Sequence, residues 1–303
     1  MSFASLNIDN WLVEALETVG IKEPTEIQNA CIEPILAGRD VIASAKTGSG
    51  KTAAFALPIL QQLSTDPFGV FCLVLTPTRE LAFQIAEQFR VLGASMQLKQ
   101  AVVVGGLDMM SQALQLAQKP HIIIATPGRL VDHINSCKDA IHLKRLRFLV
   151  LDEADRLLDD TFANDLQTIF DAIPKRRQTL LFSATMTPEI EQLSFSTTQP
   201  FVYSCAARFD TVAKLDQKYL FIPSAVALAY LAHVVMTEFA DKTMIIFVSK
   251  AKTCEMLRLL FRELGIRSTA LHSSMTQPDR LGSLAKFKSA VVPILIATDV
   301  GSR

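Results

Sequence analysis

The chain has 303 residues, a length that holds about two domains with cores of their own. Half of its residues are hydrophobic and 20% are charged, which excludes an intrinsically disordered chain. Lys and Arg together number 30, as do Asp and Glu, so the molecule lacks the net positive charge of many nucleic-acid binders. The charge is unevenly placed, because residues 1–205 hold 17 basic and 22 acidic side chains and residues 206–303 hold 13 and 8. The two halves are complementary in charge, which favours their closing on each other.

The cysteines and the N-terminal residues indicate a reducing compartment. Five cysteines are scattered without a Cys-x-x-Cys pair, so the sequence predicts neither a disulfide framework nor a zinc site. Residues 1–10 lack the order of basic, apolar and small residues that marks a secretory signal. A long uncharged stretch between Lys218 and Glu238 is interrupted by Pro223, Ser224 and His233, so we expect a strand and a helix there and no membrane span.

Short β-rich apolar runs alternate with segments of helical period along the chain. The expected strands are 40–44, 70–75, 100–104, 121–125, 148–151 and 179–182, then 217–221, 244–248, 268–271 and 293–297. Between them Leu81, Ile85 and Phe89 repeat at helical spacing. This alternation predicts an α/β protein with parallel sheets covered by helices. Residues 204–215 follow neither period, so we expect a linker there between domains 1–203 and 216–303.

A glycine-rich segment follows the first expected strand and precedes a helical stretch over 53–63. It reads Ala45-Lys46-Thr47-Gly48-Ser49-Gly50-Lys51-Thr52. Gly48 and Gly50 allow backbone N–H groups to turn around phosphate oxygens, and the helix N-terminus adds its positive dipole end. In such a loop Lys51 reaches the β- and γ-phosphates and Thr52 ligates Mg²⁺. The segment therefore predicts a nucleotide phosphate site, although it begins with Ala45 where the general pattern has glycine.

Acidic residues follow the expected strand 148–151 directly, as Asp152-Glu153-Ala154-Asp155. Ligand sites in open α/β sheets lie at the carboxyl ends of strands. A bound nucleotide needs one acidic group to hold Mg²⁺, often through water, and a second to orient or deprotonate the attacking water. Asp152 fits the first role and Glu153 the second.

Together with further motifs, these segments resemble the DEAD-box ATP-dependent RNA helicases, a branch of superfamily 2. The resemblance covers essentially the whole chain and implies two RecA-like parallel-sheet domains, the second incomplete. The further motifs, in chain order, are Phe3 with the segment Gly20–Gln28, Pro77–Ala82, Gly105-Gly106, Thr126–Arg129, Ser183-Ala184-Thr185, Ile246–Val248, Gln277 with Arg280, and Ala297–Val300.

The resemblance implies that two residues near the N-terminus read the adenine. Gln28 would contact the adenine edge through its amide, a bidentate geometry that Gln and Asn commonly offer to this base. Phe3 would stack on the ring. The alternatives are a place for Gln28 on a polar helix face and for Phe3 in a hydrophobic staple.

Further residues are implied to contact RNA, as backbone ligands that position a strand without reading its sequence. In the first half these are Thr78, Arg79, Gly105, Gly106, Thr126, Gly128 and Arg129, and in the second half Gln277, Arg280 and Thr298. Asp299 resembles a partner of the ATP ribose or of interdomain contacts. Ser183 and Thr185 resemble the element that couples the nucleotide site to strand separation through hydrogen bonds to the acidic motif. A plain turn at the two glycines, a helix cap at Thr185 and ordinary surface polarity in the second half remain open alternatives.

The implied activity is that of a monomeric RNA helicase that binds ATP and Mg²⁺, grips RNA and separates short duplexes. The surrounding sequence is similar to members that act in ribosome assembly, which implies a nuclear or nucleolar location and pre-ribosomal proteins as partners. A phosphate-binding kinase would leave Gln28, Arg79 and Arg129 unexplained.

Family members continue past Ala297–Val300 with an Arg-rich motif that supplies an arginine finger, a group worth roughly 10³–10⁵ in rate. Because the chain stops at Arg303, we expect a fragment or short form with little turnover and an uncovered hydrophobic edge on the second sheet. The alternative function is a hydrolysis-deficient clamp for ATP and RNA that competes with the full-length helicase.

Overall fold

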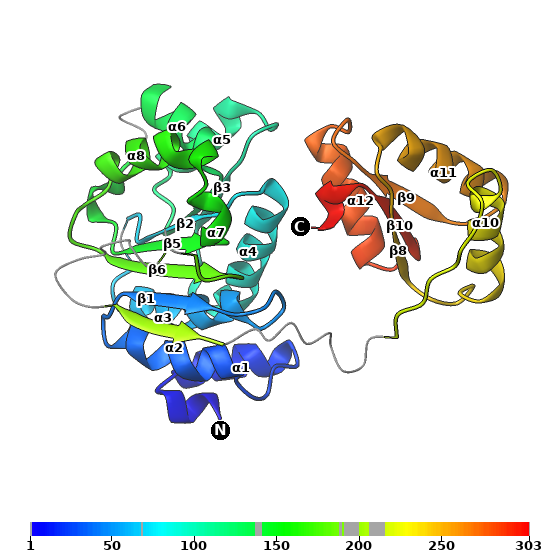
Figure 1. Cartoon of the computed structure of the whole chain (residues 1–303). Helices are drawn as coiled ribbons and strands as arrows, with labels where there is room; N and C mark the ends of the chain where they lie inside the picture. The colour runs from blue at the N-terminus through cyan, green and yellow to red at the C-terminus, as the bar shows by residue number, and fades with distance from the viewer. Residues whose placement is uncertain are drawn as a thin grey trace. The chain divides into compact units, whose positions relative to one another are not determined.

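The chain folds into two units, Met1–Phe209 (unit 1) and Asp210–Arg303 (unit 2). Each unit contains a parallel sheet covered by helices (Figure 1). The computed structural model describes residues 2–67, 69–136, 141–187, 190, 200–205 and 216–302. The α/β class predicted from the alternation of strands and helices is confirmed. Residues 206–215, most of the predicted linker, lie outside the described residues.

Unit 1 contains a seven-stranded parallel sheet in the order β3-β4-β2-β5-β6-β1-β7. Its strands are β1 (Val41–Ser44), β2 (Cys72–Leu75), β3 (Gln100–Val103), β4 (Ile122–Ala125), β5 (Phe148–Asp152), β6 (Gln178–Ser183) and β7 (Phe201–Ser204). The helices and 3₁₀ turns are η1 (Phe3–Leu6), α1 (Asn10–Thr18), α2 (Glu26–Leu36), α3 (Lys51–Thr65), α4 (Arg79–Leu92), η2 (Ala94–Met96), α5 (Met109–Ala117), α6 (Pro127–Ser136), η3 (Leu143–Arg145), α7 (Ala154–Leu157), η4 (Asp160–Phe162) and α8 (Ala163–Ala172).

Successive side chains of each strand point to opposite faces of this sheet, and each face has its own core. Val74 of β2 packs in the cluster formed with η1 and α1–α4, whereas its neighbours Leu73 and Leu75 pack in the cluster formed with α5–α8. Both faces are therefore covered, which explains why the strands read as continuous apolar runs rather than as alternating ones.

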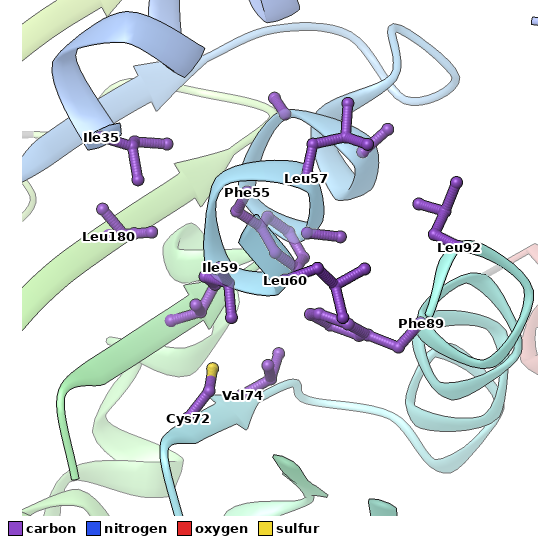
Figure 2. Close-up of a cluster of buried hydrophobic side chains, with 14 of the residues drawn as sticks. Ile35, Phe55, Leu57, Ile59, Leu60, Cys72, Val74, Phe89, Leu92 and Leu180 are labelled. Carbon is purple, nitrogen blue, oxygen red and sulfur yellow. The ribbon is translucent and has the colours of Figure 1, made fainter. Parts of the chain in front are cut away.

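Helix α3 lies at the centre of the first core (Figure 2). Phe55 projects from it and is fully buried, with its ring centroid 5.2 Å from that of Phe182 in β6 and 6.1 Å from that of Phe89 in α4. Figure 2 shows Leu57, Ile59 and Leu60 of the same helix among side chains from β2 and α4. This packing fixes the helix that begins at Lys51, and with it the loop before that helix.

Unit 2 holds a three-stranded parallel sheet in the order β8-β10-β9. Its elements are α10 (Ala227–Thr237), β8 (Met244–Phe247), α11 (Ala251–Glu263), β9 (Ser268–Leu271), α12 (Gln277–Lys288), β10 (Ile294–Ala297) and η5 (Asp299–Ser302). Strand β10 is central and buried. Among the strands of this sheet, the exposed large apolar side chains lie on the edge strand β8, where Ile245 is 46% and Phe247 56% exposed.

Two expectations about strands are corrected by the structure. The predicted strand 217–221 is wrong, because this segment has no strand partner among the described residues and leaves Tyr219 and Phe221 more than 90% exposed. Strand β7 was not expected, although it pairs in parallel with β1 from Phe201 to Ser204. Within the described residues, no helix is both long and apolar enough to cross a membrane.

Candidate functional site

The glycine-rich loop joins the carboxyl end of β1 to the first turn of α3. Gly48 and Gly50 have φ angles of +80° and +91°, in the left-handed region that side-chain-bearing residues rarely adopt. A Cβ at Gly50 would also lie 2.4 Å from Nε2 of Gln28. Glycine is therefore required at Gly50 both by backbone conformation and by the close approach of Gln28.

Lys51 turns back into this loop. Its Nζ donates hydrogen bonds to the carbonyl oxygens of Ala45 at 2.7 Å and Ser183 at 3.4 Å. Burial lowers the pKa of Lys51, while the charges of Asp152 and Glu153 oppose that effect. The ammonium group thus lies between the loop carbonyls and the acidic motif, at the carboxyl ends of β1, β5 and β6.

The acidic residues end β5, as the sequence predicts. Asp152 is 5% exposed, and burial raises the pKa of its carboxyl from 3.8 to about 6, with the Lys51 charge acting in the opposite direction. Glu153 has a left-handed backbone with φ of +53° and caps the short helix α7. A left-handed conformation at a residue with a side chain is strained, and such strain concentrates at functional sites.

The donor set at this edge fits Mg²⁺. Oδ1 of Asp152 is buried and has no hydrogen-bond partner in the described part of the chain. A buried oxygen of this kind needs a hydrogen-bond donor or a cation beside it. Mg²⁺ prefers oxygen ligands and is usually held by one or two carboxylates, with water and substrate phosphates. Asp152 and the hydroxyl of Thr52, at the start of α3, supply ligands of that kind.

A cavity of about 560 Å³ runs from the loop along α4. Gln28 lies in its wall, 2% exposed, with Nε2 donating to the Gly50 carbonyl at 3.1 Å and Oε1 accepting from the Thr25 N–H at 2.9 Å. Its lining residues are Val19, Ile21, Gln28, Thr47, Gly48, Gly50, Lys51, Thr52, Ala53, Leu81, Gln84, Glu87, Gln88, Val91, Leu92, Asp152 and Glu153. The cavity thus joins the glycine-rich loop, where phosphate binding was predicted, to an amide and an apolar wall.

Some residues predicted for the nucleotide site do not line this cavity. Phe3 is 2% exposed and packs in the first core. Ala45, Lys46 and Ser49 face a second, smaller cavity beside Tyr203 and Cys205. Phe3 is thus a core residue at the start of η1, and its stacking on adenine stays a prediction.

A hydrogen-bonded link connects β6 to the acidic motif. Thr185 donates from its backbone N–H at 3.2 Å and from its hydroxyl at 2.8 Å to Oδ2 of Asp155. The hydroxyl oxygen of Ser183, a buried residue, accepts a further bond from the Thr185 N–H at 3.3 Å. Thr185 thus bonds to the acidic motif through Asp155, whereas Ser183 bonds to Thr185, and the coupling role implied for both stays a prediction.

The first group of predicted RNA ligands lies at the same carboxyl edge of the sheet. Thr78 caps α4, and its side chain accepts a hydrogen bond from the Leu81 N–H at 3.4 Å. The guanidinium of the next residue, Arg79, lies against Gly105, where a Cβ would be 2.9 Å from Nη2. Gly106 has φ of +79°, so this turn needs glycine for conformation as well as for space.

A second group surrounds the start of α6. Arg129 donates from Nη1 to the Leu107 carbonyl at 2.9 Å, and its side chain is 16% exposed. Thr126 donates its N–H to the Val103 carbonyl at 3.0 Å, and Gly128 lies close to Asp165. Arg129 therefore contacts the loop after β3, and its predicted contact with RNA stays a prediction.

The predicted residues of unit 2 also gather at the carboxyl edge of their sheet. Gln277 opens α12 and accepts a hydrogen bond from Arg280 at 3.4 Å. Thr298 follows β10 and is 5% exposed, with a hydroxyl that has no hydrogen-bond partner among the described residues. Asp299 begins η5 and is exposed.

One wall of this cavity was not predicted from the sequence. Gln84, Gln88 and Val91 of α4 line it, at spacings of four and three residues. The helical repeat of Leu81, Ile85 and Phe89 located the buried face of α4, so the polar residues beside that face were a signal that this helix borders a cavity. Asp155 was named in the motif but was given no role of its own.

The chain is similar in sequence to known helicases over nearly its whole length. Residues 25–193 match the DEAD/DEAH box helicase family, and residues 227–303 match the helicase conserved C-terminal domain family. The chain is 54% identical over 308 residues to a Mus musculus protein named "Probable ATP-dependent RNA helicase DDX49", and spans 64% of its length. It is 51% identical over 316 residues to ATP-dependent RNA helicase DBP8 of Candida albicans, covering all of this chain and 72% of that protein.

Solved structures agree. A DEAD box protein from Methanococcus jannaschii is 32% identical, with a TM-score of 0.63 over all of this chain and 81% of that one. Dbp5 of S. cerevisiae, solved bound to RNA and ADP BeF3, gives a TM-score of 0.85 over all of this chain and 77% of that one. At 24% identity the latter shows a shared fold. The two RecA-like domains implied by the motifs are therefore confirmed.

Proposed function

We propose that this chain, which belongs to the DEAD/DEAH box helicase family, is an ATP-dependent RNA helicase that separates short duplexes. The chain spans 64% of the length of the mouse relative. One observation carries the proposal: Lys51, Asp152 and the Ser183–Thr185 segment meet at one edge of one sheet, beside a cavity that holds Gln28. This arrangement supports the proposal, because Lys51 would bind phosphate, Asp152 would hold a metal ion and the Ser183–Thr185 segment would link the two to the rest of the sheet.

The residues of the cavity would take separate parts of ATP. Gln28 would contact the adenine, and the backbone N–H groups around Gly48 and Gly50 would surround the phosphates. Lys51 would exchange the carbonyl oxygen of Ala45 for phosphate oxygens, a stronger, charge-assisted interaction. Glu153 would orient or deprotonate the attacking water.

The cofactor of this reaction would be Mg²⁺, held by Asp152 and Thr52. When bound, Mg²⁺ neutralises the charge that develops on the phosphate oxygens. Asp152 must be ionised to serve as a ligand, and its buried carboxyl needs a cation nearby for that reason. Lys51 supplies one positive charge to this end of the cavity.

Coupling to RNA would run through the carboxyl edge of each sheet. Thr185 bonds to Asp155, so a change at the acidic motif would reach the end of β6 directly. Thr78, Arg79 and the Gly105–Gly106 turn would contact the RNA backbone in unit 1, and Gln277, Arg280 and Thr298 in unit 2. Contacts to the 2′-hydroxyl would distinguish RNA from DNA.

The cellular setting of the proposal is ribosome assembly in the nucleolus, with pre-ribosomal proteins as partners. The resemblance of the sequence to that branch of the family supports this setting. Depletion of the protein should then change the pattern of rRNA precursors, and a fluorescent fusion should concentrate in the nucleolus. A cytoplasmic fusion with unchanged rRNA precursors would contradict it.

The biochemical test measures ATP-dependent RNA binding and RNA-stimulated phosphate release in the same samples. We expect Lys51→Ala to abolish both, and Glu153→Gln to keep ATP-dependent RNA binding while losing phosphate release. Release by the unmodified chain identifies the helicase, and binding without release identifies the clamp. Unchanged ATP affinity in the Lys51 variant would refute the assignment of the phosphate loop.

A further inference from the structure

Another cavity, also of about 560 Å³, lies at the amino ends of β5 and β6, the sheet edge opposite to the nucleotide cavity. Its lining residues are Gly38, Gln62, Lys144, Arg145, Leu146, Arg147, Phe148, Pro174, Arg176, Arg177 and Gln178. Five of these are Lys or Arg, and none of them is Asp or Glu. The cavity therefore has a strongly positive wall.

The register of the sheet brings two basic loops together. Phe148 of β5 pairs with Gln178 of β6, so the residues that precede these strands meet at one edge. The six basic side chains of the two loops, here called the basic surface, are Lys144, Arg145, Arg147, Lys175, Arg176 and Arg177. They are six of the 17 basic residues in 1–205, a region in which acidic residues are in excess. Positive charge is therefore concentrated here, in a unit whose acidic residues outnumber its basic ones.

Two of the guanidinium groups, those of Arg147 and Arg177, pack against aromatic rings. The Arg147 guanidinium lies 5.7 Å from the ring centroid of Phe71, and that of Arg177 lies 5.8 Å from the ring of Phe170. Arg177 also donates to the Pro174 carbonyl at 2.8 Å. Stacking on a ring fixes a guanidinium while leaving donors at its rim, which suits planar, bidentate recognition of phosphate or carboxylate.

Two acidic groups, Asp66 and Asp40, lie near Arg147 and Arg177 of the basic surface. Arg147 pairs with Asp66 at 3.1 Å, but both side chains are more than half exposed, so the pair is screened by water and a stronger anion can displace it. The negative charge of Asp40 attracts the guanidinium of Arg177, but Asp40 is buried and its carboxylate accepts a hydrogen bond from the Thr179 N–H at 2.8 Å. Lys144 and Arg176 are exposed at the rim of the cavity.

The chemistry of the wall favours a phosphodiester backbone over an acidic peptide. Peptide recognition depends on apolar or aromatic anchors that fill pockets, and the apolar lining residues Leu146 and Phe148 are buried at 2% and 1% exposure. Base stacking is equally unavailable, because Phe71 is 2% exposed and lies under Arg147. Charged donors without a platform for bases fit contacts to phosphates.

We infer that the basic surface binds phosphate groups of an RNA segment that lies outside the carboxyl-edge site. This inference rests on the proposed function in taking RNA as the substrate. Strand β6 has six residues, so the two edges are separated by about 20 Å at ~3.3 Å per residue. A single strand confined to the carboxyl edge does not contact the basic surface, whereas a long or structured RNA can contact both, and its second contact is then intramolecular.

The test compares two charge-neutralising double variants of the full chain by RNA binding. Lys144→Gln/Arg176→Gln removes two exposed cations of the basic surface. The matched control, Lys286→Gln/Lys288→Gln, removes two exposed cations from the last turn of α12 in unit 2. The probes are a long hairpin-containing RNA and the shortest single strand that binds in an ATP-dependent manner, each titrated over a range of salt concentrations.

We expect the first variant to lose about tenfold in affinity for the long RNA at low salt, with a salt slope shallower by about 2. Its ATP-dependent affinity for the short strand should equal that of the unmodified chain, and the control variant should match the unmodified chain on both probes. Unchanged long-RNA affinity and salt slope in the first variant would overturn the inference. Polyglutamate serves as a third probe: if the first variant loses binding to polyglutamate and keeps its RNA binding, the inference is overturned and the surface is assigned to an acidic protein. Absence of any ATP-dependent short-strand binding, in every variant, would contradict the proposed function instead.

Discussion

The carboxyl group of Asp152, the proposed Mg²⁺ ligand, is buried at a cost to folding. Burial raises the pKa of its carboxyl to about 6, so the folded chain holds a proton that the unfolded chain releases above about pH 4. The stability associated with this group is present at pH values below the unfolded pKa and is lost as the pH rises through about 6. At neutral pH the ionised carboxylate therefore destabilises the fold unless a cation is bound beside it.

Replacement of Asp152 by asparagine should stabilise the chain in alkaline solution and abolish its Mg²⁺-dependent nucleotide binding. Asparagine has nearly the same shape but does not ionise, so the free energy of unfolding should rise by about 1–3 kcal/mol at pH 8 and be unchanged at pH 4. Denaturant titrations at the two pH values measure this difference. The exposed control Asp160→Asn should stay within about 0.5 kcal/mol at both. A gain for Asp152→Asn that is equal at pH 4 and pH 8 would show that ionisation is not its cause.

The residues of the candidate site were easier to predict from sequence than their partners. Lys51 and Asp152 belong to contiguous patterns after strands, and parallel topology brings the ends of those strands to one edge without further information. What Arg129 and Phe3 contact depends on where loops and turns from other elements pack. Arg129 meets the Leu107 carbonyl and Phe3 enters a core, and neither outcome is encoded in local spacing.

At the scale of elements, strands with partners on both sides were predicted well and the exceptions have a common physical cause. Strand β7 is an edge strand whose residues alternate between half-buried and exposed, and it exists because β1 offers it a free side. Residues 217–221 have high β-propensity but are not in a strand. Propensity in a strand reflects a fit to neighbouring strands, so it cannot decide either case without knowledge of the sheet.

Helix α3 connects the nucleotide cavity to the first core, and Phe55 is its largest contribution to that core. Phe55→Ala should reduce the free energy of unfolding of unit 1 by about 3–5 kcal/mol, because it removes a fully buried ring and leaves a cavity between β6 and α4. Phe55→Leu keeps most of the volume and should cost only about 1 kcal/mol. Guanidinium titration followed by circular dichroism measures both. Equal losses for the two variants would mean that the volume of the ring is not what stabilises α3.

For the whole molecule, the two units differ in how much apolar surface they bury. Unit 1 covers both faces of its sheet with large clusters, whereas the described residues of unit 2 form one cluster of eight buried residues and a second of three. Unit 2 also leaves Ile245 and Phe247 of β8 about half exposed. Since stability rises with the apolar area removed from water, unit 2 should be the less stable of the two.

Thermal unfolding should therefore show two transitions, of which the lower belongs to unit 2. The nucleotide cavity is lined by residues of unit 1, so ATP with Mg²⁺ and without RNA should raise the upper transition and leave the lower one in place. At a concentration 100 times its Kd, a ligand that binds the folded state adds about 2.7 kcal/mol to the stability of its unit. Scanning calorimetry with and without nucleotide measures both midpoints, and Lys51→Ala is the control in which neither should move. A single transition that shifts as a whole with nucleotide would show instead that the two units unfold as one cooperative body.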